Sequence, residues 1–181
     1  MMKFLKVPIW MMTLLIGIYT VQAEVVDSSA LGFTVRLSVL VKAAPGDVYH
    51  SFVADVGNWW DSKHTFSGNA HNLTIDAKAG GCFCEKLKNG GSVRHLEVVF
   101  VDPGKTLRML GGLGPLQSLA VLGSMTWSLT PTGTGTQVEL TYSVGGYRPG
   151  GLQSMASLVD RVLSEQLKRF KDYTEQIKKK N

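Results

Sequence analysis

Residues 152–178, LQSMASLVDRVLSEQLKRFKDYTEQIK, decide the fold. Apolar side chains recur in this stretch at steps of three and four residues, and neither glycine nor proline interrupts it, which predicts one long amphipathic helix. The helix would be roughly 40 Å long at 1.5 Å per residue, and its apolar stripe must cover another apolar surface. The stripe consists of Leu152, Met155, Ala156, Val159, Leu163, Leu167, Phe170, Tyr173 and Ile177.

The chain before this helix predicts that surface, because it reads as a series of strands. From Phe33 to Val41 every second residue is apolar, as in a half-buried strand. Pro45 then starts a short helix, and a second short helix or turn begins at Trp59 after a break at Gly57. Further strands are predicted at residues 73–75, 82–87, 92–101, 106–110, 120–129 and 137–144.

We therefore expect an α+β fold, in which a curved antiparallel sheet of about seven strands surrounds the C-terminal helix and two short helices follow the first strand. The 181 residues are 44% apolar, which suits one globular domain and excludes a disordered or collagen-like chain. Lysine and arginine number 19 against 14 acidic residues, but much of that excess lies in the last turns of the helix. No basic face carries interleaved aromatic residues, so we expect no nucleic-acid partner.

The N-terminus has the pattern of a secretory signal peptide. Lys3 and Lys6 precede an apolar run over residues 7–21, and the small residue Ala23 ends the segment. We expect residues 1–23 to be removed, and residues 24–181 to form a single domain secreted into the periplasm. An uncleaved anchor is the alternative, although the run is short for a membrane span. After cleavage we expect no stable membrane span.

The order of elements resembles the helix-grip fold of the START/Bet v1-like (SRPBCC) superfamily, over nearly the whole chain after residue 23. The similarity is greatest to its polyketide cyclase/dehydrase and Hsp90-ATPase-activator-like branches. It implies a cavity between sheet and helix that holds a hydrophobic small molecule. We expect no cofactor. The residues that carry the resemblance are Trp59-Trp60, Gly80-Gly81-Cys82-Phe83, the stretch 98–107 with Asp102-Pro103-Gly104, and Trp127.

Three functions are compatible with this resemblance. The first is a secreted protein that binds an apolar or amphipathic ligand. The second is a cyclase/dehydrase-type enzyme that uses Glu85, Arg94 or His95 as acid/base groups in the same cavity. The third is a chaperone partner, which an export signal would separate from the cytosolic chaperone. We expect the first, and the sequence alone does not establish catalysis.

Asn89-Gly90 is a strong signal for a two-residue hairpin turn, which fixes the partners across it. Because side chains alternate along a strand, one face would carry the two cysteines and the other the bulkier apolar residues. The second face is the expected core side. The expected pairs are Cys82 with Glu97, Phe83 with Leu96, Cys84 with His95, and Glu85 with Arg94.

Cys82 and Cys84 allow three interpretations: a small unliganded pair, a disulfide, or a metal site with His95 and Glu97. Secretion favours oxidation. Residues two apart on a regular strand lie near the upper limit for a disulfide, so the bond requires a bulge or kink, which Gly80-Gly81 permits. Neither a CxxC nor an HxH spacing is present, so we expect no metal.

Glu85 and Arg94, if both face the core, must pair because burial of a lone charge is costly. They would serve either as a structural ion pair or as a polar anchor for a ligand. Aromatic and methionine residues complete the expected site. The predicted ligand-binding residues are Trp59, Trp60, Phe83, Glu85, Arg94, Met109, Trp127, Tyr147, Met155 and Val159.

The long helix itself suggests where the space lies. Its stripe begins with small or flexible residues, Met155 and Ala156, and continues with bulky ones from Leu163 onward. We expect a cavity of more than roughly 300 Å³ under the first part of the helix. The glycine-rich segment 111–114 would form its rim.

Overall fold

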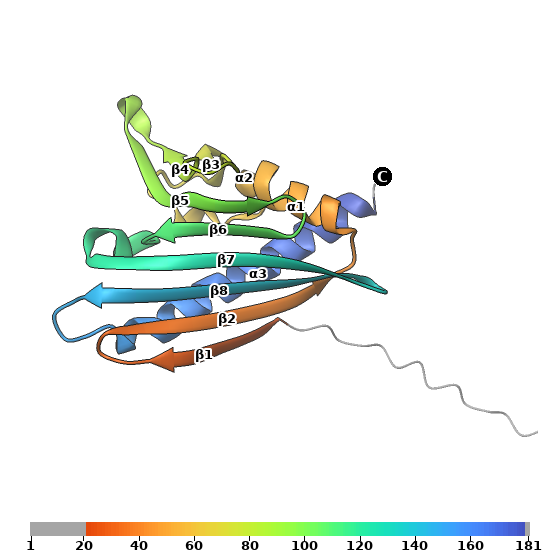
Figure 1. The fold of residues 1–181 in the computed structure, drawn as a ribbon. Coiled ribbons are helices and arrows are strands. Elements are labelled where there is room, and N and C mark those ends of the chain that lie inside the picture. Colours follow the sequence, from red (N-terminus) through yellow and green to blue (C-terminus); the bar gives the residue numbers. More distant parts are fainter. Residues whose placement is uncertain (1–20, 180–181) are drawn as a thin grey trace, which may run out of the picture.

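The computed structural model describes residues 21–179 as an open antiparallel sheet with one long helix, α3, lying across one face (Figure 1). The strands of the sheet are ordered β1-β2-β8-β7-β6-β5-β4-β3. They are β1 (Gln22–Ser28), β2 (Gly32–Val41), β3 (Leu73–Ile75), β4 (Cys82–Lys86), β5 (Ser92–Asp102), β6 (Thr106–Gly111), β7 (Ala120–Thr132) and β8 (Gly135–Tyr147). The helices are α1 (Pro45–Ala54), α2 (Val56–Trp59) and α3 (Ala156–Lys178), with short 3₁₀ turns η1 (Ser62–His64), η2 (Ala70–Asn72), η3 (Lys88–Gly90), η4 (Gly114–Ser118) and η5 (Gln153–Met155).

This arrangement confirms the α+β helix-grip fold and each of the seven predicted strands. The strand that the sequence analysis missed is β1, an edge strand that pairs with β2. All its residues are exposed, so it has no alternation of buried and exposed positions by which to recognise it. The predicted signal peptide lies outside the described residues, except for Val21, Gln22 and Ala23.

The two short helices also follow the first long strand as predicted, but the second begins earlier. Gly57 lies inside α2 rather than ending a helix. A side chain at Gly57 would meet the backbone of Ala70 and His71 at 3.0 Å, so glycine allows α2 to lie directly against η2. Gly57, which was expected to break the helix, instead permits a close contact between two backbones.

The core is solid under the second half of α3. Phe52 of α1 stacks on Trp127 of β7 with ring centroids 4.2 Å apart, and Phe170 of α3 meets Trp59 at 5.2 Å. The Trp59 indole N–H donates to the Ser51 carbonyl, which satisfies its polar atom inside the cluster. These aromatic side chains fix α1, α2 and α3 on the sheet. The first half of α3 lies outside this aromatic cluster.

No helix between residues 21 and 179 is both long and apolar enough to cross a bilayer.

Tyr142 joins the core to the rim of the sheet, and its ring packs directly against Gly123. A Cβ at position 123 would lie 2.3 Å from the Tyr142 ring, and the Tyr142 hydroxyl donates to the Gly111 carbonyl and accepts from the Leu113 N–H. We expect Gly123→Ala to lower the free energy of unfolding by about 1–3 kcal/mol, measured by urea denaturation. Gly145→Ala is the control, because its Cβ would meet nothing closer than 3.7 Å. Equal stability of both variants would contradict this packing.

Candidate functional site

A cavity of about 540 Å³ lies under the first half of α3. Its volume is above the minimum of roughly 300 Å³ expected from the sequence, and Met155 at the start of the helix lines it as predicted. Phe66 and Leu158 stand at its edge with 55% and 44% of their surface exposed, so the entrance is apolar. Its lining consists of Trp60, Lys63, His64, Thr65, Phe66, Leu73, Phe83, His95, Leu113, Gly114, Pro115, Leu116, Gln117, Ser118, Met155, Leu158, Val159, Val162 and Leu163.

His95 is the buried titratable side chain of this lining. Its imidazole contacts two phenyl rings, with centroids 5.1 Å from Phe83 and 5.8 Å from Phe66. The other ionisable groups of the lining, Lys63 and His64, are exposed. A hydrogen bond to a ligand inside the cavity is therefore most valuable at His95, where water does not compete.

Behind His95 lies Glu85, buried on β4. The His95 Nε2 is 2.9 Å from Glu85 Oε2. The same carboxylate accepts the backbone N–H groups of Phe66, at 3.1 Å, and of Ser67. With three donors around it, the carboxylate remains satisfied although it is removed from water.

These contacts determine the charges of the pair. Burial raises the pKa of Glu85, but the hydrogen bonds from Ser67, Phe66 and His95 outweigh it and lower that pKa overall. Burial lowers the pKa of His95, and the hydrogen bond and charge of Glu85 only partly oppose this. At neutral pH the pair is thus a carboxylate and a neutral imidazole.

The neutral imidazole has one tautomer compatible with this bond, with the proton on Nε2 donated to Glu85. Nδ1 is then a bare acceptor. It has no hydrogen-bond partner within residues 21–179 and is not fully enclosed by protein atoms. Because His95 lines the cavity, Nδ1 is the atom of its ring that is left to accept a hydrogen bond from a ligand.

A β-bulge turns His95 into the cavity. Beyond Phe83 the pairing of β4 with β5 shifts by one residue, and His95 is the extra residue of β5. As a result His95 and Leu96 are consecutive and both buried, whereas regular alternation would point them to opposite faces. The observed pairs are Cys82–Glu97, Phe83–Leu96, Cys84–Arg94, Glu85–Val93 and Lys86–Ser92.

The first two of these pairs were predicted, and the predicted pairs Cys84–His95 and Glu85–Arg94 are wrong. Arg94 points to solvent with 67% of its side chain exposed, and its Nη1 lies 2.9 Å from Glu97 Oε2. The bulge is the physical reason, because it exchanges the faces of His95 and Arg94. Arg94 consequently lies outside the cavity, and the partner of Glu85 is His95.

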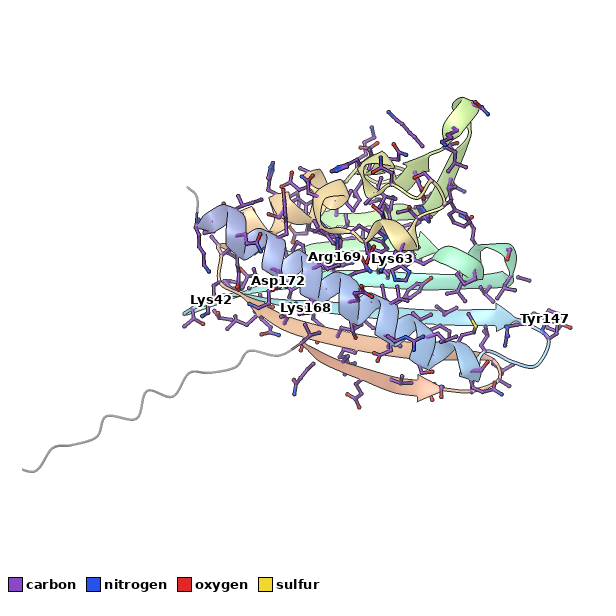
Figure 2. All side chains as sticks on the ribbon, turned by 180° about the vertical axis from the view of Figure 1, so that it is seen from behind. Lys42, Lys63, Tyr147, Lys168, Arg169 and Asp172 are labelled. Carbon is purple, nitrogen blue, oxygen red and sulfur yellow. A yellow bond between two sulfur atoms is a disulfide. The ribbon has the colours of Figure 1, made fainter. Side chains whose placement is uncertain are left out.

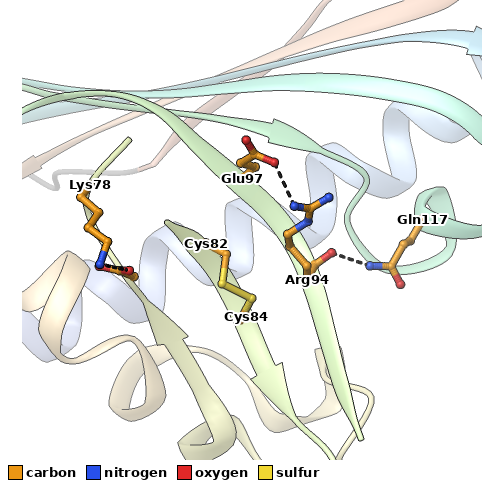
Figure 3. Close-up of a disulfide and its surroundings, with 7 residues drawn as sticks. Lys78, Cys82, Cys84, Arg94, Glu97 and Gln117 are labelled. Atoms are coloured by element: carbon orange, nitrogen blue, oxygen red, sulfur yellow. Dashed lines mark hydrogen bonds and ion pairs between the residues drawn. A yellow bond between two sulfur atoms is a disulfide. The ribbon is translucent and has the colours of Figure 1, made fainter. Parts of the chain in front are cut away.

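Cys82 and Cys84 form a disulfide on the face of β4 opposite to the cavity, beside the Arg94–Glu97 ion pair (Figure 3). Their Cα atoms are 5.4 Å apart, closer than two residues of a regular strand, which span about 6.6 Å. In the described part of the chain, no group of three or more His, Cys, Asp or Glu side chains could hold a metal ion.

The other predicted ligand-binding residues divide into three groups. Trp60, Phe83, Met155 and Val159 line the cavity. Trp59, Met109 and Trp127 are buried in the solid core, because alternation marks an inward side chain without telling core from cavity wall. Tyr147, 70% exposed, projects from the end of β8, well away from Lys63 of the lining (Figure 2).

Part of the wall was not predicted from the sequence. The segment between Trp60 and Phe66 contributes Lys63, His64 and Thr65, and the turn η4 contributes residues 114–118. Neither segment has a helical or strand period. The glycine-rich stretch beside η4 is the one signal that pointed to this rim.

A family model described as "Polyketide cyclase / dehydrase and lipid transport" matches residues 32–175, and the chain belongs to this family. This agrees with the resemblance to the SRPBCC superfamily. The match includes both strands of the β4–β5 hairpin and most of α3, and therefore all residues of the cavity.

Solved structures show the same fold at low identity. Protein MLL2253 from Mesorhizobium loti is 19% identical with a TM-score of 0.56, over 79% of this chain and 97% of that one. DynU16, a protein from the dynemicin biosynthetic locus, is 21% identical with a TM-score of 0.54, over 78% and 47%. The di-domain ARO/CYC StfQ from the steffimycin pathway is 15% identical with a TM-score of 0.55, over 81% and 52%. No curated protein matches the sequence.

The lowered pKa of His95 predicts a pH dependence of stability. The unfolded chain protonates His95 near pH 6.5, whereas the folded protein does so only at lower pH. The stabilisation is therefore complete above about pH 6.5 and is lost as the pH falls through the lower folded pKa. We expect the free energy of unfolding, measured by urea denaturation, to decline less between pH 7.5 and 5.5 in His95→Gln than in wild-type protein. His50→Gln, at an exposed position of α1, should retain the wild-type slope, and an unchanged slope in His95→Gln would contradict the assignment.

Proposed function

We propose that the protein binds an apolar small molecule that carries a hydroxyl group, held in the cavity under α3 with the hydroxyl donating to His95 Nδ1. The observation that carries this proposal is the unpartnered acceptor of the one buried ionisable side chain in a largely apolar wall. Family membership supports a small-molecule ligand in general terms.

The size and chemistry of the cavity support a ligand of two to four fused rings or a comparable chain. About 540 Å³ lies within the range in which proteins enclose small molecules. Apolar side chains from α3, β3 and η4 form most of the wall, so burial of apolar surface supplies the affinity. The acceptor on His95 then orients the ligand, because an unpaired polar group costs about 1–3 kcal/mol.

Acid/base catalysis is the second candidate function, and the Glu85–His95 hydrogen bond favours it. A neutral imidazole whose Nε2–H is held by a carboxylate has its other nitrogen free to take a proton from a bound substrate. The two other ionisable side chains of the lining, Lys63 and His64, are exposed, so His95 is the one buried acid/base group of the lining. Binding is accordingly the first candidate, and turnover of a bound cyclic substrate would establish the second.

A matched pair of probes, 2-naphthol and 2-methylnaphthalene, tests the proposed binding. They differ by a hydroxyl in place of a methyl group. We expect both to bind wild-type protein in calorimetric titrations. The ratio of their dissociation constants should shift by at least about fivefold toward 2-methylnaphthalene in His95→Phe, because one hydrogen bond of about 1 kcal/mol is lost. Comparing ratios cancels the difference in hydrophobicity between the probes.

Two variants of α3 test whether the probes bind in this cavity. Val159→Trp fills the cavity and should weaken both probes at least about tenfold, whereas Ser157→Trp, at an exposed position outside the lining, should leave them unchanged. Failure of 2-methylnaphthalene to bind, or equal effects of the two substitutions, would refute binding in this cavity.

We propose further that the protein acts after export, in the periplasm. The charged, apolar and small-residue order of residues 1–23 supports this, and so does the disulfide, since disulfides persist in oxidising compartments. N-terminal sequencing of the exported protein should begin at Glu24. A membrane-bound form that starts at Met1 would contradict export with cleavage.

A further inference from the structure

Two compensating bulges in the β4–β5 hairpin determine which polar side chain faces the cavity. Asn89 and Gly90 form the turn with φ of 59° and 79°, as a two-residue hairpin turn requires, and the Gly91 N–H donates to the Lys88 carbonyl. The Leu87 N–H donates to the same Gly91 residue, at its carbonyl, which shifts the ladder by one residue on the β4 side. The bulge at His95 shifts it back.

The segment between these two bulges has an alternative pairing that removes both of them. Sliding residues 92–95 by one position would give one uniform ladder from the turn to Cys82. In that ladder Arg94 would turn inward beside Glu85, and His95 would turn outward beside Cys84. The alternative exchanges a neutral acceptor at the cavity for a guanidinium group.

We infer that the Cys82–Cys84 disulfide holds the shifted pairing and so positions His95 in the cavity. The disulfide draws the two Cα atoms to 5.4 Å, which shortens and bends β4 on its outer face. A β-bulge bends its strand and increases the local twist, so a bulge in β5 allows that strand to remain paired with a bent β4. The shift in pairing falls between Phe83 and Cys84, within the span that the disulfide closes.

Noncovalent contacts on both faces are consistent with this arrangement. On the outer face, the Arg94 side chain forms an ion pair with Glu97 at 2.9 Å, and the backbone carbonyl of Arg94 accepts from the amide of Gln117 in η4 at 2.8 Å (Figure 3). On the inner face, Glu85 is held by the backbone of Phe66 and Ser67. The surface ion pair contributes little, since Arg94 and Glu97 are largely exposed. The disulfide is the covalent constraint on the pairing, and Cys82 and Cys84 are positioning residues for His95.

The test compares oxidised wild-type protein with Cys82→Ser/Cys84→Ser by NMR. Cross-strand NOE contacts report whether residue 84 lies opposite residue 94 or residue 95. We expect residue 94 in wild-type protein and residue 95 in the double variant. Retention of the 84–94 pairing without the disulfide would overturn the inference. Should the serine variant fail to fold, Cys82→Val/Cys84→Val, which favours strand structure, gives the same readout.

Gly123→Ala is the matched control, because it destabilises the protein with the disulfide intact and should keep the 84–94 pairing. A functional readout rests on the proposed function: the double variant should lose the hydroxyl preference, a change of about fivefold or more in the ratio for the two naphthalene probes, as in His95→Phe. It should still bind 2-methylnaphthalene. A retained preference would overturn the inference, whereas failure of wild-type protein to bind either probe would refute the proposed function and leave the NOE test valid.

Discussion

The hydrogen bond between Glu85 and His95 is the interaction on which the proposed site depends. Burying a carboxylate is costly unless hydrogen-bond donors replace the water it loses. Glu85 has three such donors, the backbone N–H groups of Phe66 and Ser67 and the imidazole of His95. In return the carboxylate fixes the imidazole tautomer, so the free nitrogen of His95 is an acceptor. The same carboxylate accepts the backbone N–H groups of Phe66 and Ser67, which ties the segment after η1, with Phe66 at the entrance, to the Glu85–His95 pair. Wall, entrance and polar anchor are thereby held as one unit.

The long helix serves two purposes along its length. Its second half packs into the aromatic cluster of Phe52, Trp59, Trp127 and Phe170, which fixes its position on the sheet. Its first half, from Leu158 to Leu163, covers the cavity together with Met155 of the preceding turn η5. A rigid anchor at one end allows empty space at the other, because the cost of unfilled volume is offset by a well-packed core elsewhere. The fold thus provides a preformed cavity of the kind in which small molecules are enclosed.

The sequence predicted the fold because long periodic segments are the strongest local signals. The stripe of residues 152–178 and the alternation of residues 33–41 follow directly from helical and strand geometry. The face assignments of His95 and Arg94 failed because alternation assumes a regular ladder, and two compensating bulges leave both ends of the hairpin in the predicted pairing. Similarly, inward alternation identified Trp127 and Met109 but not whether they meet protein or empty space. Tyr147 was misplaced because β8 continues to residue 147 instead of ending at residue 144, and its side chain is exposed there.

The most direct test of this account is a long-range ¹⁵N–¹H spectrum of the His95 ring at neutral pH. We expect a neutral imidazole with the proton on Nε2 and an unprotonated Nδ1, whose ¹⁵N resonance moves when 2-naphthol is added and stays in place with 2-methylnaphthalene. An imidazolium, a proton on Nδ1, or an Nδ1 resonance that ignores both probes would contradict the claim that Glu85 holds His95 as the acceptor of the cavity.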